Sequence, residues 1–154
     1  MWEQFRRFSA LERPAQSLFL RAGLLLPLVT LSLRWRGFRE TQAVLERFFS
    51  NPNLKQESAA VGNRVALTAH LVNVADRHGL VHHSCLAKSL TLWWLLGRQG
   101  IASDLRIGIR KDGDKFQAHA WVERGGTALN EPDEHHRHYA AFDAAFSSLS
   151  SDEQ

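Results

Sequence analysis

The sequence predicts an α+β fold in which helices come first and a cysteine-bearing helix then packs on a small antiparallel sheet. Three observations support this. Residues 1–75 show helical patterning and no strand pattern. Residues 84–100 form a strongly apolar helical segment. Alternating strand-like segments follow it. We therefore expect a helical N-terminal region, 1–75, and a core region, 76–150, within one compact unit.

The N-terminal region is expected to hold three helices. Ser9 and Glu12 fit a capping box, in which each side chain caps a main-chain N–H at the helix start, and the first helix would run on to Leu33. A second helix is expected over residues 39–49, before a turn-forming Ser-Asn-Pro-Asn run. A third is expected over residues 59–78, because the glycine that follows ends helices readily.

The longest apolar stretch runs from Ala22 to Leu33, with Arg21 and Arg34 at its ends. It is shorter than the roughly 20 residues that span a bilayer, so we expect a buried helix and no membrane span. A membrane-surface role is the alternative. The first residues carry both charge signs and lack the features of a secretory signal. A cytoplasmic location is expected.

Composition excludes several classes of protein. The formal charge is only +3, and no dense Lys/Arg run appears, so nucleic acid is not an expected partner. One cysteine allows no intramolecular disulfide and no Cys-rich zinc site. His82 and His83, and the trio His135, His136 and His138, lack the spacing of helical metal ligands. We expect neither a metal nor a cofactor.

The core region begins with the cysteine helix. Ser84 fits its N-cap, and Gly100 fits its C-terminal stop. Trp93 and Trp94 lie on its broad apolar face and are expected in the core.

Strands are expected over residues 104–110, 116–123 and 127–130. Two consecutive glycines, 125 and 126, form the tight turn between the last two. In the middle strand an apolar face of Phe116, Ala118, Ala120 and Val122 alternates with a face that carries His119 and Trp121.

Cys85 falls in the first turn of its helix, where main-chain N–H groups lack partners and the helix dipole favours negative charge. A thiolate is stabilised there, and the same N–H groups can hold an oxyanion. The alternative is a small buried residue without chemistry. His119 on the following strand is positioned to act as the base of a Cys–His pair.

A third group is needed to orient the imidazole. The last strand ends at Asn130 and Glu131, and a hairpin returns this end toward His119. Glu131 is our candidate third catalytic residue, Asn130 is the alternative, and Asp133 lies close by. His83, on the loop entering the helix, and Trp121, on the His119 face, are candidate substrate-binding residues.

Two strings carry a resemblance to a known family: SCLAKSLTLWWLLGRQGIASDLRIGIRKDG and FQAHAWVERGGTALNE. They are similar to the cysteine helix and the His–acid run of the leader peptidases of lasso peptide biosynthesis, a branch of the transglutaminase-like superfamily. The similarity covers about residues 83–143. It implies a transglutaminase/papain-like core, with Cys85 as nucleophile and His119 as base.

The resemblance also implies substrate and partners. These peptidases remove the leader from a ribosomally made precursor peptide. The chain lacks a fused leader-recognition segment in its first 75 residues, which implies a separate leader-binding protein and a lasso cyclase as partners. Glu131 stands where the family usually has Asp. Lys88 stands where the family often has Arg, which makes it a further candidate substrate contact.

Two alternatives share these residues. One is acyl transfer to an amine in place of water, through the same cysteine. The other is a non-catalytic scaffold for the leader-binding protein and the cyclase, which the Glu131 departure keeps open.

Overall fold

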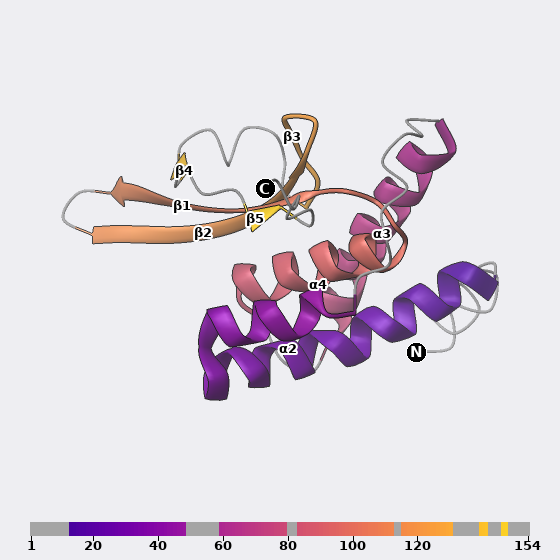
Figure 1. The fold of residues 1–154 in the computed structure, drawn as a ribbon, viewed down its shortest axis with the longest axis horizontal. Helices are drawn as coiled ribbons and strands as arrows, with labels where there is room; N and C mark the ends of the chain where they lie inside the picture. The colour runs from indigo at the N-terminus through magenta and orange to yellow at the C-terminus, as the bar shows by residue number, and fades with distance from the viewer. Residues whose placement is uncertain are drawn as a thin grey trace, which may run out of the picture.

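The computed structural model describes residues 13–48, 59–79, 83–112, 115–130, 139–141 and 146–147. Helices form one layer and the sheet lies across them (Figure 1). The helices are α2 (Arg13–Glu46), α3 (Ala59–His78) and α4 (Cys85–Arg98). The strands are β1 (Asp104–Asp112), β2 (Lys115–Arg124), β3 (Thr127–Ala128), β4 (Ala140–Ala141) and β5 (Phe146–Ser147). The predicted α+β fold is confirmed.

The sheet is built on the long β1–β2 hairpin. Its strands run in the order β3-β2-β1-β4, and β5 also pairs with β1. The β1–β2 ladder is antiparallel from the pair Asp104–Glu123 to the pair Asp112–Lys115. Gly125 and Gly126 both have positive φ, 56° and 79°, as a two-residue turn of this hand requires, which confirms the predicted turn into β3.

Helix α2 differs from its prediction in two ways. It continues past Leu33 to Gly37 and then on to Glu46, where we had expected two helices with a connection between them. Gly37 alone makes the break, with φ 79° and ψ −179°, a conformation that glycine adopts without the steric cost of a Cβ. The predicted capping box, Ser9 and Glu12, lies outside the described residues.

The expectation that the apolar stretch is buried holds for one face of α2 only. Ala22, Leu26 and Val29 are buried. The opposite face exposes large apolar side chains, namely Leu20, Leu24, Leu28, Leu31 and Trp35. By length and composition α2 also qualifies as a candidate membrane span, and only 17% of its most apolar window is buried inside the molecule.

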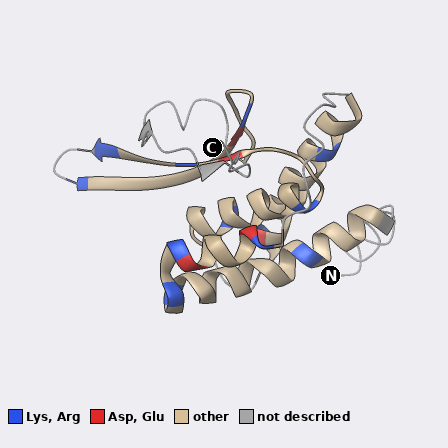
Figure 2. Ribbon diagram, viewed as in Figure 1, with Lys and Arg blue, Asp and Glu red and all other residues tan. Residues whose placement is uncertain are grey.

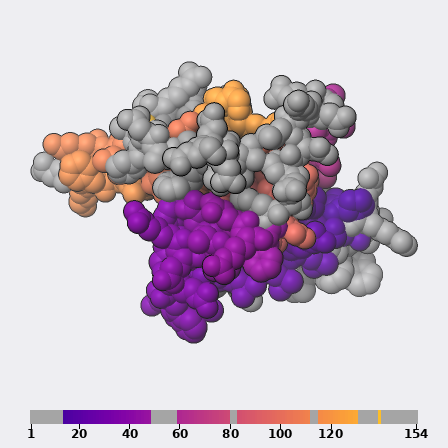
Figure 3. Space-filling model, in the orientation of Figure 1, coloured from indigo at the N-terminus to yellow at the C-terminus, as the bar shows by residue number. Residues whose placement is uncertain are grey.

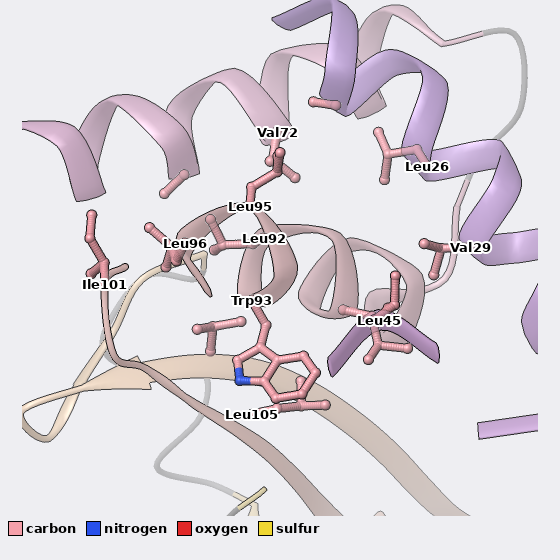
Figure 4. Close-up of a cluster of buried hydrophobic side chains, with 14 of the residues drawn as sticks. Leu26, Val29, Leu45, Val72, Leu92, Trp93, Leu95, Leu96, Ile101 and Leu105 are labelled. Carbon is pink, nitrogen blue, oxygen red and sulfur yellow. The ribbon is translucent and has the colours of Figure 1, made fainter. Parts of the chain in front are cut away.

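The core joins α2, α3 and α4 to the root of the hairpin (Figure 4). Trp93 is fully buried at its centre, and its indole Nε1 donates a hydrogen bond to the Ser103 carbonyl at 3.1 Å. Leu105 of β1 and Val122 of β2 are fully buried in the same cluster. The core therefore fixes α4 against the first residues of β1 and the last residues of β2.

The far half of the hairpin extends past the N-terminal end of α4, at which Cys85 lies (Figures 1 and 3). Phe116, predicted on a buried face, is 71% exposed there, because no described helix reaches that part of β2. Lys111 and Lys115 lie at this end, where the described ends of β1 and β2 are blue in Figure 2, and Asp112 and Asp114 lie between them in the sequence. The predicted alternation of buried and exposed residues along this strand is not observed. Residues 115–118 are all exposed, and Ala120, Trp121 and Val122 are all buried at the root.

Candidate active site

The site is built at the start of α4. Ser84 caps the helix, with extended backbone angles and its Oγ accepting from the Ala87 N–H at 3.2 Å, as predicted. Cys85 is the first residue of the helix and is partly exposed. Its sulfur therefore lies at the positive end of the helix dipole while staying open to reagents.

Cys85 and His119 are in contact, which the sequence predicted. A hydrogen bond from the His119 side chain holds the pKa of the Cys85 thiol below its ordinary value. Main-chain hydrogen bonds from Ala120 and Leu86 and the charge of His119 act in the same direction, while burial opposes them. Main-chain groups that stabilise a thiolate must donate through N–H, so two amides point at the sulfur. This is the environment of a reactive cysteine.

Aromatic side chains hold the His119 ring. It stacks on Trp121, with centroids 6.2 Å apart and planes at 20°, and contacts Tyr139 at 5.1 Å. Trp121 is only 2% exposed, so it supports the imidazole from the interior. Its predicted role in substrate binding stays a prediction.

Gly108 makes room for this aromatic packing. It lies directly across the β1–β2 ladder from His119. A Cβ at this position would come within 3.0 Å of two Trp121 ring carbons and of the Tyr139 Cβ. The absence of a side chain at Gly108 therefore lets both rings approach His119.

Replacing Gly108 with alanine is expected to displace these rings, destabilise the protein by about 1–3 kcal/mol and slow alkylation of Cys85. Gly62 is the matched control, because a Cβ there meets nothing within 4 Å and alanine favours a helix by up to about 1 kcal/mol. Urea denaturation and iodoacetamide kinetics check both variants. Equal behaviour of G108A and G62A would contradict the role given to Gly108.

A buried hydrogen-bond network ties α4 to β2 beside the Cys–His pair. Ser89, one turn after Cys85, donates to the Ala120 carbonyl at 2.8 Å. Asn130 donates from Nδ2 to Ser89 Oγ at 3.0 Å and accepts at Oδ1 from the Val122 N–H at 2.8 Å. Asn130 thus holds the strand, in contrast to the expectation that it orients the His119 ring.

The other predicted contacts of the site lie on its helical side. His83 Nδ1 is 2.9 Å from Thr30 Oγ1. That hydroxyl donates its single hydrogen to the Leu26 carbonyl, so His83 is the donor to it. Lys88 pairs with Asp76 of α3 at 3.4 Å. Both residues anchor α4 to other helices, and their predicted contact with substrate stays a prediction.

Several predicted residues lie outside the described part of the chain. They are Glu131, Asp133, His82, His135, His136 and His138. The identity of the third catalytic member is therefore still a prediction. Among the residues that the structure does describe, no group of three or more His, Cys, Asp or Glu side chains is placed to hold a metal ion.

Sequence reasoning missed Ser89, Gly108 and Tyr139. Ser89 had a usable signal, since it lies four residues after Cys85 and so on the same side of the helix. Gly108 had a weaker one, as a glycine inside a strand that permits close approach. Tyr139 lies 20 residues beyond His119 and gave no local signal.

A cysteine at a helix N-terminus, contacted by a histidine from an adjacent strand, defines a thiol-nucleophile site of the kind used in acyl transfer. Residues 25–142 match the transglutaminase-like superfamily, and the chain belongs to it. No curated protein and no solved structure gives a significant match to the chain. The match begins within α2 and ends just after β4, and so it includes Cys85 on α4 and His119 on β2.

Proposed function

We propose that this protein is a cysteine peptidase that removes the leader from a ribosomally made lasso precursor peptide in the cytoplasm. The observation that carries the proposal is the contact between His119 and a Cys85 thiol of lowered pKa at the start of α4. Membership of a superfamily that includes cysteine proteases and acyltransferases supports the reaction class. The lasso assignment depends on the resemblance of the cysteine helix and the His119 strand described above.

The first half-reaction forms a thioester. The Cys85 thiolate attacks the carbonyl carbon at the leader–core junction, and the carbonyl oxygen takes up the negative charge. Main-chain N–H groups at the start of α4 stabilise that charge. The C–N bond then breaks, and the His119 imidazolium gives its proton to the leaving amine.

The second half-reaction is hydrolysis. His119, now neutral, takes a proton from a water molecule that attacks the thioester. The C–S bond breaks, the leader leaves as a carboxylic acid, and the thiolate is restored. In this scheme a separate leader-binding protein delivers the precursor and a lasso cyclase takes the freed core peptide.

Replacing Cys85 with alanine is expected to abolish leader removal, because the chain has no second cysteine to replace the nucleophile. The assay mixes the protein with a lasso precursor peptide and its leader-binding protein, and mass spectrometry follows the products. C85S is the matched control that preserves shape with a weaker nucleophile. Cleavage by C85A at the wild-type rate would refute the proposal.

The same spectra separate the alternatives. A leader of free-acid mass indicates hydrolysis, and a leader bonded to an amine indicates acyl transfer by the same thioester. The non-catalytic alternative predicts that Cys85 reacts with iodoacetamide no faster than a free thiol at neutral pH.

A further inference from the structure

Among the described residues, one edge of β2 has no partner strand next to Cys85. In an antiparallel strand, the main-chain N–H and C=O of alternate residues point to the same edge. Ala120 and Val122 point away from β1, since Ser89 donates to the Ala120 carbonyl and Asn130 accepts from the Val122 N–H. By the same alternation, Phe116 and Ala118 present their N–H and C=O groups to this edge.

Within the described residues, this edge is paired only near its end. β3 covers it at Glu123 and Arg124, and α4 covers it at Ala120 through Ser89 and Cys85. No described strand pairs with the edge at Phe116 or Ala118. The open stretch therefore begins two residues from the main-chain amide that contacts the catalytic sulfur.

The surroundings of the open edge suit a peptide. Phe116 is 71% exposed and Ile109, on the same face of the hairpin, is 37% exposed, so apolar side chains of a bound strand would find contacts there. Lys115 lies at the far end of this edge, and a charged residue on an edge strand discourages pairing between copies of the chain.

We propose that the substrate binds as an extra antiparallel or parallel strand on β2, hydrogen-bonded to the main chain of Phe116 and Ala118, with its scissile carbonyl delivered to Cys85. This inference rests on the proposed function and specifies its substrate as an extended, unfolded segment. Recognition through main-chain groups gives affinity without a strict sequence requirement. The unpaired edge ends at Ala120, which fixes how far along β2 the substrate can bind. That position then determines which peptide bond lies at Cys85 and is cut.

The test uses alanine-based probes, which offer main-chain hydrogen-bonding groups and only methyl side chains. An epoxysuccinyl group reacts with the Cys85 thiolate. It is joined to the N-terminus of a tetra-alanine chain in one probe and, through a diamine, to the C-terminus of that chain in the other, so both directions of binding are sampled. We expect one of the two probes to label Cys85 faster than the epoxysuccinyl diamide alone. In a bound strand, every second alanine directs its N–H toward β2. N-methylation of those alanines should lower the labelling rate by about threefold or more per lost hydrogen bond, and N-methylation of the other alanines should leave the rate unchanged.

A118P is the matched variant, because proline removes the outward N–H while its place on an edge strand is sterically tolerated. A118P should lower the rate at which the faster probe labels Cys85 to the rate that the N-methylated probe shows with the wild-type protein. K111P is the control, since residue 111 faces the opposite edge of the same hairpin. Iodoacetamide labelling, which needs no peptide contact, should be unchanged in K111P. In A118P it reports the state of the Cys–His pair, and the rate of the faster probe is compared after division by the iodoacetamide rate.

The outcomes separate the two proposals. If Cys85 is activated toward iodoacetamide but the tetra-alanine chain gives no gain, or methylation shows no alternation, the edge proposal is wrong and the peptidase proposal stands. If Cys85 reacts as an ordinary thiol, the peptidase proposal fails, and the edge proposal fails with it.

Discussion

Replacing His119 with glutamine is expected to move the pH midpoint of Cys85 alkylation upward and to slow peptide hydrolysis by about a hundredfold or more. The His119 hydrogen bond is the largest cause of the lowered pKa of Cys85. Glutamine supplies neither a positive charge nor a base. The thiolate would then be populated only at higher pH, and the leaving amine would lose its proton donor.

The direction of this shift follows from the charge of the reactive form. Groups that favour the thiolate lower its pKa, so their removal raises the pKa toward the ordinary value of about 8.5 for cysteine. The amides of Leu86 and Ala120 persist in the variant and keep part of the stabilisation. The measurement is the rate of iodoacetamide alkylation as a function of pH, with mass spectrometry to count the label.

H70Q is the matched control, because His70 is an exposed histidine on α3. It should leave both the alkylation midpoint and the hydrolysis rate at wild-type values. An unchanged midpoint in H119Q would show that His119 does not set the ionisation of Cys85, and the mechanism proposed above would lose its base.

The placement of Cys85 and His119 was predictable because each position depends on local structure. Ser84, Cys85 and Gly100 mark a capped helix by residue type alone, and the alternation around His119 marks a strand. The contact between them needs the helix to pack on the Ala120 and Val122 face of the strand. It also needs the start of the helix to lie at the strand edge, because His119 is on the opposite face. Few other arrangements bury the apolar faces of both.

What the sequence did not reveal depends on how far one element extends past another. Phe116 has the same pattern as Val122, yet one is exposed and the other is buried. The reason is that α4 begins at Cys85, beside Ala120, and leaves the far half of the hairpin uncovered. The exposed apolar face of α2 has the same origin. Apolar residues lie on all sides of this helix, and the core covers only one side. Periodicity records which face a residue is on and not whether anything covers that face.

Asn130 shows a different limit. Its position at the end of the last strand was correct, but a polar residue near a histidine does not reveal which group it bonds. In the structure its amide bridges α4 and β2 at Ser89 and Val122. It thereby ties the helix that holds Cys85 to the strand that holds His119.

Replacing Asn130 with alanine is therefore expected to destabilise the protein by about 2–5 kcal/mol, since it leaves the Val122 N–H and the Ser89 hydroxyl buried with one hydrogen bond fewer each. N63A is the matched control, at an exposed helical position where alanine is neutral or favourable. Urea denaturation gives both values. A loss in N130A no larger than that in N63A would contradict the bridging role.

A second measurement separates support of the fold from support of the site. Ser89 and Asn130 share a hydrogen bond, so S89A and N130A should be coupled in a double-mutant cycle by about 0.5–3 kcal/mol. The network also holds the main chain at Ala120, whose amide contacts the Cys85 sulfur. In the folded fraction of either variant, the alkylation midpoint of Cys85 should consequently rise. A midpoint that stays at the wild-type value while stability falls would mean that the network holds the fold alone, and that the core around Trp93 is enough to keep helix and strand aligned.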